Sequence, residues 1–201
     1  METETGKKLR VLRTDRGGEF TSIEFGFYYA GQGLERHLTA PYSPQQNDVI
    51  ERRNQMVVGM ARTMLKAKRM PAAFWGEAVR TVVFILNYAP TKSLKGTTPF
   101  EAWHGRKPDV SFLRTFGCVG HVKKTKPNLA KLEDRSTPMV FLGYERGSKA
   151  YRLYDPASSK VVMSRDIVFN EAVCWGWESG DGKATPGGLS SSFTVEYMVY
   201  L

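Results

Sequence analysis

The stretch that decides the fold runs from Leu12 to Asn54. It opens with LRTDRGGEF at residues 12–20 and closes with PYSPQQNDVIERRN at residues 41–54. Asp15 ends an apolar run, Glu51 lies at the start of a long amphipathic segment, and 35 residues separate the two. Carboxylates at a strand end and in the first turn of a helix are held rigidly, as ligands of paired divalent metal ions must be. The pair therefore favours phosphodiester chemistry on DNA.

Each carboxylate also has a structural interpretation. An Asp before Arg16-Gly17-Gly18 is typical of a turn, and Asp48 precedes Glu51 by the three residues of a capping box. Taken singly, each residue favours the structural interpretation. Taken with the Gln-rich loop and the basic helix that follows, the two together favour the catalytic one.

Hydrophobic periodicity predicts the elements around this pair. A strand is expected over residues 8–14, a helix over 20–33, a second strand over 34–40 and a loop over 41–48. A helix from Val49 to about Met70 carries one apolar stripe, formed by Val57, Met60, Ala61, Met64 and Leu65. A helix over 71–88 follows, and its buried face is predicted to comprise Phe74, Trp75, Ala78, Val82, Ile85 and Leu86. Thr98 and Pro99 open a short capped helix.

The second half of the chain is predicted to form β structure. Strands are predicted over 115–122, 138–144, 150–154 and 160–169, with a hairpin turn over 155–159. This spacing indicates a small antiparallel barrel. Residues 179–192 have the composition of a flexible linker, and the last nine residues are apolar and aromatic.

The chain is strongly basic, with a formal net charge of +9 and a pI near 9.6. A polyphosphate backbone is the commonest partner of such a chain. The side chains of Lys66, Lys68 and Arg69 are candidates for phosphate contacts, as are Lys123 and Lys124; a solvated surface is the alternative in both places. The histidines His37, His104 and His121 show no ligand spacing, and the four tryptophans are expected to serve packing.

Composition also limits the setting of the protein. Cys118 and Cys174 form neither a disulfide framework nor a zinc pattern, which fits a reducing compartment. No apolar run is long enough for a membrane span, so no membrane partner is expected. An intracellular, nuclear location is expected, although the basic residues are too scattered to form an import cluster.

The two opening motifs, with Glu51-Arg52-Arg53-Asn54, resemble the integrase core of plant copia-type retrotransposon Pol polyproteins. The resemblance extends through FWGEA at 74–78, TPFEAWHGRKP at 98–108 and FGC at 116–118. It continues through VFLGY at 140–144, YRLYD at 151–155 and SRDIVF at 164–169, and covers roughly residues 9–175.

The resemblance implies an α/β fold. A truncated RNase H-like integrase core is expected over residues 1–110, an SH3-like β-barrel over 111–175 and a flexible tail over 176–201. Asp15 corresponds to the second Asp of an Asp, Asp, Glu triad and Glu51 to its Glu, so both are expected to be catalytic and to bind Mg²⁺ or Mn²⁺. Asn54 is expected at the rim of the active site. Arg53 is expected to contact DNA with the two groups of cations named above.

Two departures from the family pattern matter. The first Asp of the triad belongs to an earlier strand, which we expect to be missing, so a weak metal site and no activity of the chain alone are expected. Asp48 replaces the glycine that is usual in the loop. Three function classes stay open: an integrase completed in trans or by a longer upstream chain, a non-enzymatic DNA-binding module, and an inert transposon remnant. Besides DNA, the expected partners are a second copy in a homo-oligomer or a longer integrase chain.

Overall fold

The computed structural model describes the backbone of residues 6, 8–14, 22–38, 44–124, 131–145 and 147–177. Within these ranges, the side chains of residues 12–14, 36, 38 and 44–50 are outside the description. Asp15, the linker over 179–192 and the C-terminal residues therefore keep their predicted status. The chain divides into two compact units, residues 1–55 and 56–201.

The first unit contains the predicted strand, helix and second strand, and the two strands pair in parallel. β1 (Val11–Thr14) pairs with β2 (Glu35–Leu38), and Val11 lies opposite Glu35. Helix α2 (Ile23–Gly31) connects them, and the Ser22 hydroxyl accepts a hydrogen bond from the Phe25 amide at 3.2 Å, which caps the helix. None of the α2 side chains is buried, and Ile23 and Phe27 are 78% and 76% exposed.

Helix α3 (Pro44–Ala67) begins five residues before the predicted start. The predicted loop over 41–48 is therefore wrong for residues 44–48. Proline is compatible with the first turn of a helix because the amide it lacks has no partner there, and the two glutamines after it favour a helix. Composition alone made this segment resemble a loop.

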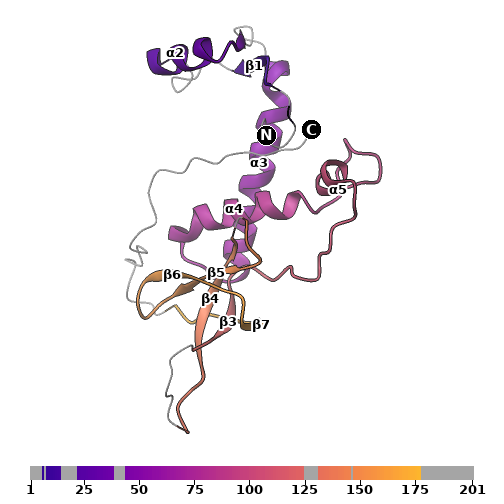
Figure 1. Ribbon diagram of the computed structural model, residues 1–201. Coiled ribbons are helices and arrows are strands. Elements are labelled where there is room, and N and C mark those ends of the chain that lie inside the picture. Colours follow the sequence, from indigo (N-terminus) through magenta and orange to yellow (C-terminus); the bar gives the residue numbers. More distant parts are fainter. Residues whose placement is uncertain are drawn as a thin grey trace. The chain divides into compact units, whose positions relative to one another are not determined.

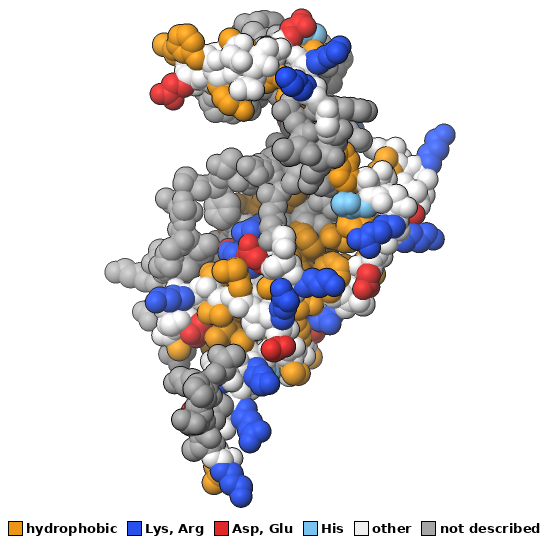
Figure 2. All heavy atoms as spheres, in the orientation of Figure 1, with side chains coloured by type: hydrophobic (Ala, Val, Ile, Leu, Met, Phe, Trp, Pro, Cys, Tyr) orange, Lys and Arg blue, Asp and Glu red, His pale blue; other side chains and the backbone are white. Residues whose placement is uncertain are grey.

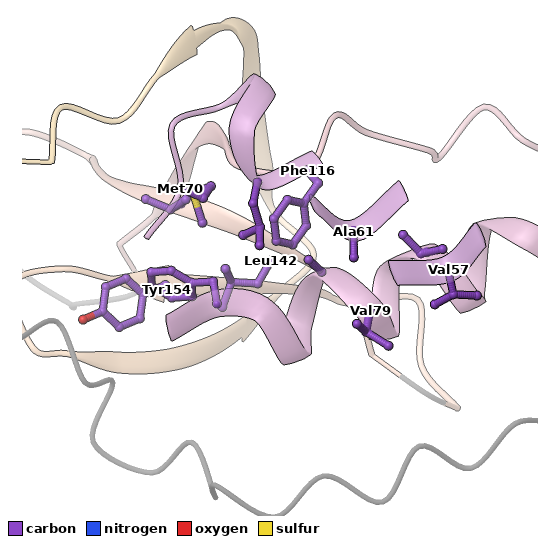
Figure 3. Close-up of a cluster of buried hydrophobic side chains, with 12 residues drawn as sticks. Val57, Ala61, Met70, Val79, Phe116, Leu142 and Tyr154 are labelled. Carbon is purple, nitrogen blue, oxygen red and sulfur yellow. The ribbon is translucent and has the colours of Figure 1, made fainter. Parts of the chain in front are cut away.

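From Val57 onward, α3 contributes its predicted stripe to the core of the second unit (Figure 3). Val57, Ala61 and Leu65 are buried, and Met60 and Met64 are partly buried against the same cluster. A 3-10 turn, η2 (Ala72–Phe74), then leads into α4 (Trp75–Leu86). Short α5 (Pro99–His104) begins after Thr98, whose hydroxyl accepts from the Glu101 amide at 3.1 Å.

Helix α4 is buried on more of its surface than the sequence predicted. Phe74, Ala78 and Val82 are fully buried as expected, but Trp75 is 37% exposed, which contradicts its prediction as a core residue. Two polar residues of α4, Glu77 and Thr81, are buried although the sequence did not predict it. Glu77 accepts hydrogen bonds from Arg152 at 2.7 and 3.4 Å, and the Thr81 hydroxyl donates to the carbonyl of Leu142 at 2.8 Å.

Five antiparallel strands follow, in the order β6-β5-β4-β3-β7. They are β3 (Cys118–Lys123), β4 (Ser136–Tyr144), β5 (Tyr151–Asp155), β6 (Lys160–Ser164) and β7 (Ile167–Cys174). The predicted strand over 160–169 is two strands, β6 paired with β5 and β7 paired with β3. Residues 165 and 166 are neither Gly nor Pro, so nothing in the composition marks the change of partner. The turn between β5 and β6 is confirmed, with Asp155 accepting from the Ala157 amide at 3.0 Å.

Helix α4 lies against β4 (Figure 1) at an irregular point of that strand. The register with β5 shifts between Phe141 and Gly143, and Thr81 satisfies the Leu142 carbonyl at the shift. A Cβ atom on Gly143 would collide with the Thr81 hydroxyl oxygen. Glycine is therefore required here for the helix to approach the strand.

Among the described helices, none combines the length and hydrophobicity that a transmembrane segment needs.

Gly117 makes a similar close approach to the end of α3. Its φ is +77°, and a Cβ atom there would lie 2.8 Å from Lys68 Cβ and 3.0 Å from Met70 Cγ. The FGC sequence at 116–118 thus packs against the residues that follow α3 and leads into β3.

We predict that Gly117→Ala lowers the free energy of unfolding by about 3 kcal/mol, from the positive φ plus the steric overlap. Gly96→Ala is a matched control, because Gly96 has the same φ of +77° with no atom within 4 Å of its added methyl. The control should lose only about 1 kcal/mol, the cost of the backbone conformation. Urea unfolding followed by tryptophan fluorescence measures both, and equal losses would exclude a packing role for Gly117.

Candidate functional site

Glu51 is an exposed residue of α3, the eighth residue of that helix. The prediction that it occupies the first turn is wrong, because α3 begins at Pro44 and has no acidic residue in its first turn. Asp48 has helical backbone, so it is not the N-cap of a capping box. Stabilisation by the helix dipole falls off after one turn, so it contributes little to Glu51.

Two further predicted site residues follow Glu51 on α3. Asn54 is exposed and lies three residues on, on the same face of the helix as Glu51. Arg53 is half-buried. Glu51 and Asn54 therefore present a carboxylate and an amide side by side to solvent.

Among the described residues from Glu51 to Asn54, one side chain, that of Glu51, is a suitable ligand for a divalent metal ion. The exposed Glu51 carboxylate is a hard oxygen donor of the kind Mg²⁺ and Mn²⁺ prefer. Across the described part of the chain, no three His, Cys, Asp or Glu side chains gather as a metal site would need. Asp15 and the Asp48 side chain lie outside that part, so the Asp15–Glu51 pair stays a prediction.

The cations at the end of α3 have different surroundings. Lys66 and Arg69 are exposed, whereas the Lys68 ammonium donates a hydrogen bond to the Glu171 carbonyl on β7 at 2.6 Å. Lys68 therefore fastens α3 to the sheet. Lys66 and Arg69 are the residues of this group that can meet an external anion.

Glu171 is the centre of a polar cluster on β7. Its carboxylate accepts from the Thr115 hydroxyl and from the Thr115 amide at 2.9 Å, and lies 4.0 Å from Arg114 Nε. The hydrogen bond from the Thr115 hydroxyl, with smaller contributions from Arg114 and Lys68, lowers the pKa of Glu171 from its ordinary value of 4.5. Close by, burial raises the pKa of the Cys118 thiol to about 11, so this cysteine is not a nucleophile at neutral pH.

A second basic region lies on the β3–β4 hairpin, which projects from the sheet (Figure 1). Lys123 is exposed at the end of β3, and Arg135 is exposed just before β4. The Lys124 ammonium lies 4.0 Å from Glu133, so its charge is partly compensated. Of the two lysines predicted to bind DNA here, Lys123 is the more available.

The structure adds an ion-pair network that the sequence did not reveal. Arg152 of β5 contacts Glu77 at 2.7 Å and Glu145 at 2.9 Å, and its side chain is 15% exposed. Burial by itself would lower the pKa of Arg152, but the hydrogen bonds to Glu77 and Glu145 outweigh burial and raise it. The network joins α4 to the sheet and has a structural role. No sequence signal places these three residues together, because they come from separate elements.

Four more exposed cations, Lys92, Lys95, Arg106 and Lys107, lie on either side of α5. The sequence did contain a signal for them, namely four cations and one acid within residues 92–107.

We predict that Glu171→Gln changes the acid limb of the stability curve. Because the folded-state pKa is lowered, the carboxylate stabilises the fold above about pH 4.5 and loses this effect as the pH falls through the folded-state pKa. The wild-type chain should exceed the variant by up to about 1 kcal/mol in unfolding free energy at pH 7, since the group is partly exposed. The difference in urea unfolding should shrink as the pH falls below 4.5 and vanish once the carboxylate is protonated in both states. A difference that does not vary with pH would contradict the assigned interactions, and Thr115→Val should remove part of the same effect.

The sheet matches a known family. Residues 118–183 match the model of the retroviral polymerase SH3-like domain. The described part of this range contains all five antiparallel strands and confirms the expected SH3-like domain.

Similar proteins extend over most of the chain. It is 41% identical over 172 residues, 86% of its length, to the retrovirus-related Pol polyprotein from transposon TNT 1-94 of Nicotiana tabacum. It is 29% identical over 171 residues, 85% of its length, to that of transposon RE1 of Arabidopsis thaliana. A chain of the simian T-cell lymphotropic virus intasome, solved with a PP2A regulatory subunit, superposes with a TM-score of 0.42 at 16% identity. That match covers 82% of this chain and 58% of the viral chain.

The chain spans only 13% and 12% of the two plant polyproteins that it matches. The matched segment nevertheless includes most of the described core and the strands of the SH3-like domain. Over most of its length the chain is therefore similar to a segment of retrovirus-related Pol polyproteins from plant transposons, consistent with the copia type, and it contains a retroviral polymerase SH3-like domain.

Proposed function

We propose that this chain is an integrase-type segment of a transposon polyprotein and that it binds double-stranded DNA. The observation that carries the proposal is the exposure of Lys66, Arg69 and Lys123 in a unit where Lys68 is committed to the fold. Exposed cations that form no ion pair with another described residue are available to replace the counterions of a phosphate backbone.

The separation of these cations suits an extended partner. The end of α3 contacts Gly117, directly before β3, and Lys123 ends the same strand. The five-residue advance from Cys118 to Lys123 corresponds to roughly 17 Å at the rise of an antiparallel strand. Phosphates on one DNA strand follow each other every 3.4 Å or so along the axis, so these cations would reach phosphates several nucleotides apart.

The catalytic part of the proposal rests on the resemblance of residues 12–54 to the integrase core. We propose an RNase H-like arrangement for residues 1–110, for which the parallel β1–α2–β2 unit is the supporting observation. The proposed domain limits are those expected from the sequence, with the SH3-like domain over 111–175 and a tail over 176–201. Asp15 and Glu51 would hold Mg²⁺ or Mn²⁺, which when bound would polarise the phosphate and lower the pKa of an attacking water or hydroxyl group.

A third carboxylate completes the metal site in the family, and the resemblance assigns it to none of these 201 residues. The proposal is therefore that DNA binding belongs to this chain and that strand transfer needs a carboxylate supplied by a longer integrase chain. A DNA-binding module without catalysis is the second candidate function. It is favoured by the exposed cations, which all act without metal.

DNA binding should be measured with a duplex of about 30 base pairs over a range of salt concentrations. The triple variant Lys66→Gln, Arg69→Gln, Lys123→Gln should reduce the slope of log K against log salt by about 2 to 3, because each phosphate contact contributes about 0.9. Lys68→Gln is the matched control, because Lys68 lies between Lys66 and Arg69 in sequence, directly after α3. It should lower the free energy of unfolding by about 1 kcal/mol, through loss of its bond to Glu171, with a change in slope below about 1. Failure of the wild-type chain to bind DNA would refute the proposed function and favour an inert remnant.

Catalysis is tested by a strand-transfer assay with Mn²⁺ and a donor DNA end. The 201-residue chain alone should show no turnover. Turnover by this chain that is abolished in Asp15→Asn or Glu51→Gln would overturn the expected inactivity and show a complete active site.

A further inference from the structure

A second set of exposed cations surrounds α5. Lys92 and Lys95 precede the helix, and Arg106 and Lys107 follow it. We call these four residues the α5 surface. They are separate in sequence from the cations of α3 and of the β3–β4 hairpin.

Hydrogen bonds fix the segment before α5 and the start of the helix itself. Before it, the amides of Leu94 and Thr97 bond to the carbonyls of Thr91 and Leu94 at 3.2 and 3.3 Å, which folds the Lys92–Lys95 segment into two successive turns. At the start of α5, the Phe100 amide bonds to the Asn87 carbonyl at 2.9 Å and fixes the helix to the end of α4.

After the helix, Gly105 turns the chain back. Its φ is +66°, and its amide bonds to the Glu101 carbonyl at 2.9 Å. The Arg106 guanidinium consequently lies over the Phe100 ring, 5.6 Å from the ring centroid. The His104 ring lies 4.3 Å from the same ring, so Phe100 supports both side chains.

The charge of the α5 surface is uncompensated. Within the part of the chain that the structure describes, none of its four cations forms an ion pair, and the single acid of residues 92–107, Glu101, is half-buried. Lys and Arg side chains gather around a histidine in the region of α5 (Figure 2). The exposed Asp109 lies two residues after Lys107, so four positive charges against one exposed negative charge leave a net positive field.

The surface also lacks the apolar side chains that other anionic partners use. None of the large hydrophobic residues between 87 and 109 is exposed. Protein interfaces centre on buried aromatic or aliphatic anchors, and membrane-binding surfaces insert apolar side chains between headgroups. A predominantly cationic surface, with the Arg106 guanidinium over the Phe100 ring, suits phosphate oxygens.

We propose that the α5 surface is an additional contact site for the phosphate backbone of double-stranded DNA. It rests on the proposed DNA binding and extends it, since Lys92, Lys95, Arg106 and Lys107 add contacts beyond those of Lys66, Arg69 and Lys123. The contacts are independent of base sequence because these side chains meet phosphate and no base edge.

The test uses the full chain with all four residues of the α5 surface replaced by Gln. A control variant carries Lys8→Gln, Arg10→Gln, Lys160→Gln and Arg165→Gln, four exposed cations whose loss changes the net charge equally. For the α5 variant, the slope of log K against log salt should fall by about 2 to 4, with at least a tenfold loss of affinity near 0.1 M salt. The control should lose less than one unit of slope. Circular dichroism checks both folds, and Lys92→Gln with Lys95→Gln alone serves if loss of the Arg106–Phe100 contact weakens the fold.

Each outcome has one meaning. An unchanged slope in the α5 variant, or equal losses in both variants, overturns the α5 site while wild-type DNA binding keeps the proposed function intact. Absence of wild-type binding overturns both. Binding to phosphatidylserine vesicles that depends on the same four residues, without an effect on DNA, would assign the surface to a membrane and overturn the DNA site.

Discussion

The second unit depends on the contact of α4 with the irregular point of β4. The Thr81 hydroxyl donates to the Leu142 carbonyl, which lies where the pairing of β4 with β5 shifts. A buried carbonyl without a partner costs about 1–3 kcal/mol, so this hydroxyl permits the irregularity. Gly143 permits the approach, because a side chain there would displace Thr81. The Arg152 network with Glu77 and Glu145 fixes the same helix to β5 and to the residue after β4. The VFLGY sequence at 140–144 is thus explained by packing.

This contact also decides which cations remain for function. Because α4 and the sheet form one core with the second half of α3, Lys68 reaches the Glu171 backbone and is used to hold that core together. Its neighbours Lys66 and Arg69 point to solvent. Lysines two residues apart therefore have different roles, one structural and the other a candidate for DNA contact.

The two units differ in how much of their apolar surface is buried. In the second, rings of Phe74, Tyr154 and Trp177 pack within 4.9 to 6.2 Å of one another. In the first, helix α2 buries none of its residues, and Phe27 and Ile23 remain more than three-quarters exposed. Among the described residues, the buried aromatic packing therefore lies in the unit that carries the exposed DNA-binding candidates, while Glu51 and Asn54 belong to the other unit.

Periodicity determined the helices, the strands and the apolar stripe of α3, because burial on one face leaves a repeat that can be read locally. The family resemblance likewise came from the sequence, through motifs at fixed positions from Leu12 to Phe169. The sequence could not show that α3 starts at Pro44, since proline and asparagine occur both in loops and in first turns. Nor could it show that residues 160–169 divide between opposite edges of the sheet, or that Trp75 is exposed while Glu77 and Thr81 are buried. Those outcomes depend on partners distant in the chain, and only the tertiary structure brings an acid on α4 to an arginine on β5 or a lysine just after α3 to a carbonyl on β7.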